Sequence, residues 1–196
     1  MKRIIIVILV VLGALLAGCR LTSISGSGDV VTQEETITGF DKVQISHGFR
    51  VEISQGDTFS VVVRVDDNLV QYLQVVKQDN TLKIGLEPDR TYVSATLRAE
   101  VTMAELNRLT LRHGSRATVS GSGGEVTVEA FDGSRGDLQA FAVENATVVA
   151  RGGSRLTVNV SGKLVADAHE GSRVDYLGNP TDVTTNTTGG SEISPQ

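Results

Sequence analysis

A Gly-Ser-Arg tripeptide recurs four times in the second half of the chain, and this repeat constrains the fold more than any other feature. Its copies begin at Gly114, Gly133, Gly153 and Gly171, and Gly190-Ser191-Glu192 is a degenerate fifth copy. Successive glycines are separated by 19, 20, 18 and 19 residues. A nearly constant period of this size is typical of a solenoid, in which each repeat forms one coil stacked on the coil before it.

Apolar and polar residues alternate after each glycine, which predicts a strand with one buried face. The arginines fall on the outward face, together with Thr118, Asp137, Thr157 and Asp175. The glycine itself is expected at a corner, where a positive φ is needed. The serine and every second residue after it are expected to face inward: Ser115, Ala117 and Val119; Ser134, Gly136 and Leu138; Ser154, Leu156 and Val158; Ser172, Val174 and Tyr176; Ser191 and Ile193.

A second strand is expected before each glycine. Two strands and two corners in each repeat fit one coil of a parallel β-helix, in which equal positions stack about 4.8 Å apart. The 21 glycines and the many Val, Thr and Ser residues also favour an all-β fold. The inward residues of this second strand are predicted to be Leu109 and Leu111; Val126, Val128 and Ala130; Ala146, Val148 and Ala150; Leu164, Ala166 and Ala168; Val183 and Thr185.

The amino-terminal half contains a related coil. Residues 40–54 align with residues 106–120 at a constant offset of 66, with His, Gly, Arg and Ser among the identities. Because this offset is not a multiple of the repeat, the segment between is expected to be irregular. It is predicted to hold strands at 58–65 and 81–86, a short helical turn at 67–73 and a turn at 78–80. The polar tail, residues 184–196, suits the open end of a solenoid.

The start of the chain resembles the signal of a bacterial lipoprotein. Lys2 and Arg3 precede an unbroken apolar stretch over residues 4–16. This stretch suits a secretory signal and is shorter than the roughly 20 residues of a membrane-spanning helix. Leu16-Ala17-Gly18-Cys19 then resembles a lipobox, which implies cleavage before Cys19 and lipidation of its sulfur and of the new amino terminus. The alternative is an ordinary secretory signal that happens to contain the chain's single cysteine.

These patterns divide the chain into three parts. Residues 1–18 are expected to form a lipoprotein signal peptide, residues 19–37 a lipidated amino terminus and tether, and residues 38–196 the β-solenoid domain. Position 20 is Arg and not Asp. By resemblance to the sorting rules of double-membraned bacteria, this favours the outer membrane over retention at the inner one.

The negative net charge limits the partners. Without Lys2 and Arg3, 16 of the 18 basic residues remain against 23 acidic ones. An acidic surface disfavours nucleic acid and anionic lipid headgroups. Aromatic residues make up only 4% of the chain and tryptophan is absent, which weakens the case for a stacking platform for sugars or bases.

Several segments together resemble the head GIN domain family of auto-transporter adhesins, over roughly residues 28–194. The family is similar in fold to the pectin lyase-like right-handed β-helices. The resemblance therefore implies a single-stranded right-handed parallel β-helix and a role in cell adhesion, and it carries over no functional residues. The corners here continue as Ser-Arg, where Ser-Gly-Asp is common in the family. The matching segments are Gly39–Val43, His47–Asp57, Val65–Leu69 and Thr81–Ile84, followed by the Gly-Ser coils.

The outward arginines, Arg116, Arg135, Arg155 and Arg173, have two readings. They can form a solubilising face that protects the sheet, partly offset by Asp137 and Asp175 in exposed pairs of about 0–1 kcal/mol each. They can also form a binding stripe for an anionic polymer. A second candidate patch lies two residues before the corner glycines, where Phe131 is expected between the guanidiniums of Arg112 and Arg151 in a cation–π sandwich.

Catalytic, metal and cofactor sites are not indicated. Asp137 and Asp175 share a column two coils apart, about 10 Å by the strand spacing, which is at or beyond the range of an inverting carboxylate pair. Glu129 and Asp167 are separated in the same way. The three histidines are expected at exposed corners of different coils, whereas a zinc site needs three convergent ligands.

The sequence thus indicates a lipid-anchored protein of the bacterial cell envelope, on the periplasmic or the surface face of the outer membrane. We expect a non-catalytic role in adhesion or scaffolding, with an envelope or extracellular polysaccharide or protein as partner. A polysaccharide-active β-helix enzyme is the first alternative, and it requires a groove with carboxylates on adjacent coils. A periplasm-facing partner in envelope sensing is the second.

Overall fold

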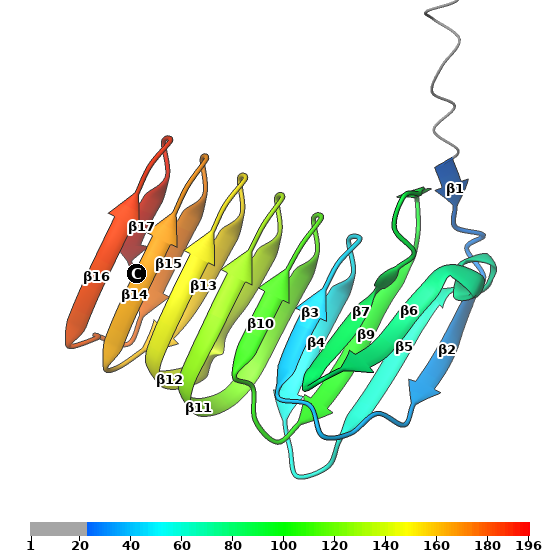
Figure 1. The fold of residues 1–196 in the computed structure, drawn as a ribbon, viewed down its shortest axis with the longest axis horizontal. Helices are drawn as coiled ribbons and strands as arrows, with labels where there is room; N and C mark the ends of the chain where they lie inside the picture. The colour runs from blue at the N-terminus through cyan, green and yellow to red at the C-terminus, as the bar shows by residue number, and fades with distance from the viewer. Residues whose placement is uncertain (1–22) are drawn as a thin grey trace, which may run out of the picture.

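Short strands, paired mostly in parallel, stack along the long axis of the molecule (Figure 1). The computed structural model describes residues 23–196, so the expected signal peptide and Cys19 lie outside the described residues. The predicted all-β class is confirmed: the described residues hold strands and one 3-10 turn, η1 (Asp67–Tyr72). None of their helices is long and apolar enough to cross a membrane.

The strands follow the chain in this order: β1 (Ser23–Ser25), β2 (Val30–Glu35), β3 (Lys42–Ile45), β4 (Arg50–Gln55), β5 (Ser60–Asp66), β6 (Leu73–Gln78), β7 (Thr81–Leu86), β8 (Thr91–Val93), β9 (Leu97–Met103), β10 (Arg108–Leu111), β11 (Arg116–Ala130), β12 (Arg135–Ala150), β13 (Arg155–Val160), β14 (Lys163–Ala168), β15 (Arg173–Leu177), β16 (Asp182–Thr187) and β17 (Glu192–Pro195).

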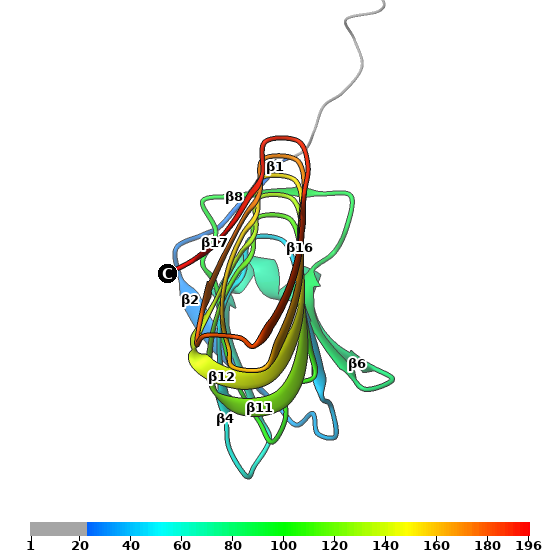
Figure 2. The ribbon, with the colours of Figure 1, turned by 90° about the vertical axis from the view of Figure 1, so that its left-hand side faces the viewer.

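Two faces of strands enclose the core. The first face runs β2-β5-β9-β4-β11-β12-β13-β15-β17, and the second runs β6-β7-β3-β10-β11-β12-β14-β16. The long strands β11 and β12 belong to both faces because each bends from one to the other at the end opposite the corner turns. Most strands therefore join into one 15-stranded sheet that folds over on itself like a nearly closed, flattened barrel (Figure 2).

The repeats stack in register on the first face. Arg116 pairs with Arg135, Arg135 with Arg155, and Arg155 with Arg173, so equal positions of successive repeats are neighbours. Nearly all residues predicted to face inward are buried or half-buried. The prediction is wrong for Val183 and Thr185 of β16, and Val183 is 42% exposed. Their strand ends the stack, and no further coil covers it.

A pair of residues in left-handed conformation makes each corner between the faces. The corner glycines Gly114, Gly133, Gly153, Gly171 and Gly190 have φ values from 71° to 74°. The residue before each is also left-handed, as at His113 with φ 53°. Only glycine adopts this conformation without steric cost, so the predicted role of the glycine as a corner residue is confirmed.

The repeated serines lie buried beside these corners and satisfy the turn backbone. Ser115 Oγ donates to the Ile45 carbonyl at 3.2 Å and accepts from the Arg112 N–H at 3.1 Å. Ser154 Oγ donates to the Arg151 carbonyl at 2.8 Å. Ser134 Oγ is buried as well, but it has no hydrogen-bond partner among residues 23–196.

The related amino-terminal coil stacks directly on the repeats. β3 pairs with β10 and β4 with β11 at the predicted offset of 66, as in Arg50↔Arg116. The intervening segment then adds β7 and β9 to the far side of this coil, again in parallel. It closes the stack with the antiparallel strands β5 and β6, which do not follow the solenoid pattern. The predicted strand at 81–86, the helical turn and the turn near Asp79 are confirmed.

Residues 23–37 belong to the fold, which corrects the expected tether over this range. β1 pairs in parallel with β8, and β2 pairs antiparallel with β5 over six residue pairs. β2 thereby covers an edge of β5 that would otherwise be unpaired. Ile24 and Ile37 pack against the core.

The corner geometry predicts a specific cost for alanine. A Cβ at Gly133 meets no atom within 4 Å, so Gly133→Ala introduces only the left-handed strain at φ 73°. We expect the free energy of unfolding to fall by about 1–2 kcal/mol in urea denaturation. The control is Gly124→Ala, which is equally open but has no positive φ and should be neutral or stabilising. Equal effects of the two substitutions would contradict this account of the corner.

The serines predict a second contrast. Ser154→Ala removes the hydrogen bond to Arg151 and should lower the free energy of unfolding by about 1 kcal/mol. Ser134→Ala removes a buried hydroxyl without a partner, so stability should stay constant or rise. The two serines are equally buried, and urea unfolding of the two variants provides the measurement. A larger loss of stability in Ser134→Ala than in Ser154→Ala would contradict this account of the serines.

Candidate binding surface

A single row of arginines crosses the first face. The four repeat arginines are continued by Arg50 of β4, then by Arg98 of β9 and Arg64 of β5, all in direct register. At a strand spacing of about 4.8 Å the row is about 29 Å long. We call it the arginine row; in spatial order it comprises Arg64, Arg98, Arg50, Arg116, Arg135, Arg155 and Arg173.

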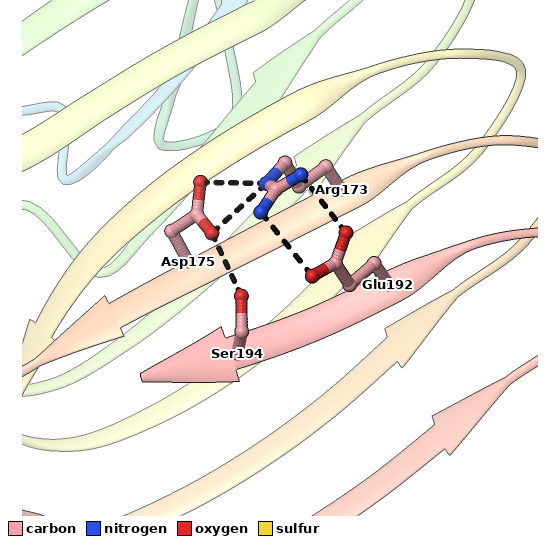
Figure 3. Close-up of polar contacts among 4 residues, drawn as sticks. All are labelled: Arg173, Asp175, Glu192 and Ser194. Carbon is pink, nitrogen blue, oxygen red and sulfur yellow. Dashed lines mark hydrogen bonds and ion pairs between the residues drawn. The ribbon is translucent and has the colours of Figure 1, made fainter. Parts of the chain in front are cut away.

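Acidic side chains neutralise the two ends of the row. At one end, Arg64 forms an ion pair with Glu100, and this hydrogen bond and the carboxylate charge raise the pKa of Arg64. At the other end, Figure 3 shows Arg173 held between Asp175 and Glu192, with Nε 3.1 Å from Asp175 Oδ1 and Nη1 2.9 Å from Glu192 Oε2. The hydrogen bond with Asp175 raises the pKa of Arg173.

The middle of the row is not neutralised in this way. Among residues 23–196, no carboxylate lies within 4 Å of the guanidinium nitrogens of Arg98, Arg50, Arg116, Arg135 or Arg155. Asp137, expected to offset the charge, instead accepts the N–H of Gln139 at 3.1 Å. Five consecutive cations therefore face solvent on neighbouring strands, where like charges repel.

A depression of about 600 Å³ lies at the amino-terminal part of the row. Arg50, Arg64, Arg98 and Arg116 line it, together with Glu52, Glu100 and Thr118. Four guanidiniums around one hollow create a local positive potential on a protein whose net charge is −5.

Two pairs of carboxylates share columns of the sheet without being neighbours. Asp137 and Asp175 lie two strands apart with Thr157 between them, and Glu129 and Asp167 likewise flank Val149. One directly adjacent pair was not predicted from the sequence: Glu52 and Glu100, on β4 and β9, which line the 600 Å³ depression.

The aromatic patch at the corners is one-sided. Arg112 Cζ lies 4.6 Å above the centroid of the Phe131 ring, whereas Arg151 makes no such contact within the described part of the chain. The expected sandwich is therefore only half formed. Likewise, residues 23–196 hold no group of three His, Cys, Asp or Glu side chains arranged for a metal ion. Two of the histidines do approach each other, with the rings of His47 and His113 5.4 Å apart.

Three members of the row were not predicted from the sequence. Arg50 could have been predicted, because the offset of 66 aligns it with Arg116. Arg98 and Arg64 had no such signal, since they lie in the irregular segment and join the row only through strands that stack out of sequence order.

Comparison with known proteins places this geometry in context. The sequence profile of the family described as "Putative auto-transporter adhesin, head GIN domain" matches residues 39–122 and 111–180. A search of curated proteins found no match.

Solved structures share the fold at low sequence identity. A putative adhesin from Bacteroides fragilis has a TM-score of 0.58 at 14% identity, covering 88% of this chain and 100% of the other. A putative adhesin from Parabacteroides distasonis gives a TM-score of 0.58 at 14% identity, covering 89% of this chain and 100% of the other. These similarities describe the fold alone.

Proposed function

Because the chain belongs to the head GIN domain family of putative auto-transporter adhesins, we propose that it is a non-catalytic binding protein of the cell envelope. Its binding surface is the arginine row, and its ligand is an extended anionic polymer. The observation that carries this proposal is the run of five consecutive arginines whose guanidinium nitrogens have no carboxylate within 4 Å among residues 23–196.

Stability gives no reason to keep these arginines. Neighbouring like charges on one face of a sheet are unfavourable, and an uncharged polar residue such as threonine would keep the face solvated. A ligand that carries one negative charge per strand spacing would neutralise the whole run. Guanidinium groups suit this task because they bind carboxylate or sulfate through two parallel hydrogen bonds.

A polysaccharide with acidic groups fits the row better than a nucleic acid. A pyranose ring in an extended chain advances by about the distance between neighbouring strands, so the charge spacing along a polyuronate is close to the spacing of the arginines. The strands of a nucleic acid place a charge about every 3.4 Å, which does not match the spacing of the arginines.

A polysaccharide-active enzyme is the second candidate. Glu52 and Glu100 favour it, because they supply the carboxylates on adjacent strands that such an enzyme needs. Against it, Glu100 is already paired with Arg64 and its side chain is 53% exposed. Neither carboxylate has the water-excluded setting that turns a carboxyl group into a general acid.

The proposal also includes a lipid anchor at Cys19 and a parallel β-helix fold. Cys19 carries lipid and holds the protein at the outer membrane, supported by the lipobox-like Leu16-Ala17-Gly18-Cys19. A lipidated terminus with several acyl chains anchors stably. The coils form a single-stranded right-handed parallel β-helix, supported by parallel strand pairs at offsets of 17 to 20 residues.

The lipid anchor predicts incorporation of labelled palmitate. Cells expressing the full chain should yield a labelled protein, and Cys19→Ser should abolish the label because the thioether cannot form. Detection of equal label in the wild type and in Cys19→Ser would overturn the anchor. An unlabelled but exported wild-type protein would favour the ordinary secretory signal.

The arginine row predicts salt-dependent binding to a polyuronate, with polygalacturonate as the probe. Arg135→Gln combined with Arg155→Gln should weaken binding and reduce the slope of log affinity against log salt by about 2, since two charge contacts are lost. Binding isotherms at several salt concentrations provide the measurement.

A matched control removes the same charge from the other face. Arg108 of β10 and Lys163 of β14 lie outside the row, and Arg108→Gln with Lys163→Gln also removes two positive charges. This variant should bind almost like the wild type. Equal loss in both double variants would mean that only net charge matters, and unaltered binding in both would exclude the row as the site. The row variant should not unfold at a lower temperature, because it relieves repulsion.

A further inference from the structure

Three depressions near β4 share lining residues. The 600 Å³ depression of the arginine row shares Arg50 and Arg98 with a second, of about 250 Å³. This second depression shares Gly48 with a third, of about 550 Å³. We call these three adjoining depressions together the corner groove. Their lining residues extend from the corner of the β3–β4 coil to Arg50, Arg98 and Arg64 of the row.

The irregular connection between β7 and β9 builds the outer wall of the groove. Every regular coil turns this corner with two residues, but here residues 87–96 make the turn and carry β8. Figure 1 draws this connection at the same end of the molecule as the corner turns. Five residues of this connection line the same depression as His47, Gly48 and His113: Pro88, Asp89, Arg90, Thr91 and Tyr92.

Aromatic rings gather at this end although the chain has few of them. The Tyr92 ring meets His47 edge-on at 6.3 Å between centroids and lies 6.0 Å from Tyr72. Arg90 covers the other side of this cluster, with Cζ 4.8 Å from the Tyr72 centroid. Tyr92 is thus fixed by its neighbours, and its hydroxyl donates to the Glu87 carbonyl at 3.1 Å. A fixed aromatic ring in a shallow hollow is suited to contact the apolar face of a sugar ring.

His47 supplies a directed hydrogen-bond donor. Its Nδ1 accepts the Leu86 N–H at 3.3 Å and contacts Ser46 Oγ at 2.8 Å. Because Nδ1 is an acceptor, the neutral ring carries its proton on Nε2. Burial, with a smaller effect from His113, lowers the pKa of His47 and favours this neutral form. His113 lines the same depression and is exposed.

The other end of the groove is cationic. Arg50 and Arg98 have no carboxylate within 4 Å among residues 23–196, and both line the passage between the larger depressions. An anionic group on a ligand held by Tyr92 and His47 would meet these guanidiniums next.

From this arrangement we infer that the corner groove is a binding site for an acidic oligosaccharide. One sugar ring lies against Tyr92, its hydroxyls bond to His47 and His113, and a carboxylate or sulfate of the next ring pairs with Arg50 and Arg98. The inference rests on the proposed function, because these two arginines also belong to the arginine row. It adds a specific recognition site to a surface that otherwise offers only charge.

The three histidines allow a local test in the intact protein. His47 and His113 line the groove, whereas His169 lies at a distant corner, where its Nδ1 bonds to Thr188 Oγ1 at 2.6 Å. With trigalacturonate as the probe, the imidazole NMR signals of His47 and His113 should shift and those of His169 should not. Inorganic sulfate and neutral maltotriose serve as comparisons. Absence of the shift, or an equal shift with sulfate or with maltotriose alone, would overturn the inference.

Substitutions separate the groove from the row. Tyr92→Leu should weaken trigalacturonate binding about tenfold through loss of the aromatic face, with Arg98→Gln giving a loss of the same order. Arg155→Gln, in the row but outside the groove, should leave trigalacturonate binding unchanged and weaken only the polymer. If Arg155→Gln weakens polymer binding while neither Tyr92→Leu nor Arg98→Gln changes trigalacturonate binding, the groove is refuted and the row is not. Trigalacturonate binding that depends on Tyr92, with polymer binding indifferent to Arg155, refutes the row alone. Unchanged trigalacturonate binding in Tyr92→Leu also refutes the groove, provided that the variant keeps the wild-type histidine spectrum.

Discussion

In-register hydrogen bonding between successive coils is the constraint on which the rest of the structure depends. At the corners of the four Gly-Ser-Arg repeats the glycine N–H donates to a backbone carbonyl of the next coil, as from Gly133 to the Gly152 carbonyl at 2.9 Å and from Gly153 to the Glu170 carbonyl at 3.0 Å. The residue after each serine repeats the pattern, with the Arg135 N–H on Ser115 and the Arg155 N–H on Ser134, both at 2.9 Å. These bonds leave no freedom to slip by one residue, because a slip would exchange the buried and the exposed faces.

The same register that satisfies the backbone forces like side chains together. For Ser115, Ser154 and Ser172 the result is favourable, because each buried hydroxyl lies beside a backbone carbonyl or the backbone N–H of a neighbouring coil. For the arginines it is unfavourable, because cations on neighbouring strands cannot separate. Among residues 23–196, the arginines of the row that pair with carboxylates lie at its ends, Arg64 with Glu100 and Arg173 with Asp175 and Glu192. Repulsion among the five arginines between them opposes folding, which supports the proposal that this part of the row binds a ligand.

The sequence predicted what the repeat itself encodes. The corners, the buried serines, the outward arginines and the stacking of residues 40–54 on residues 106–120 all follow from spacing and alternation. It could not predict where β7 and β9 stack, because that depends on pairing between segments unrelated in sequence. For the same reason Arg98 and Arg64 were missed. Val183 is exposed because its strand, β16, is the last on its face, and this position cannot be read from the residue or from its repeat.

The corner groove arises where the repeat is broken, and this position has a physical cause. Identical coils in register make a straight wall, which can carry a line of charge but no hollow with mixed chemistry. A hollow needs one coil that turns its corner differently, and residues 87–96 provide it. Gly85 then allows the β7 backbone close to the neighbouring corner, since a Cβ there would lie 3.2 Å from His47 Nδ1. The regular coils thus form an extended charged surface, and the irregular coil adds a hollow next to it that combines aromatic, histidine and arginine side chains.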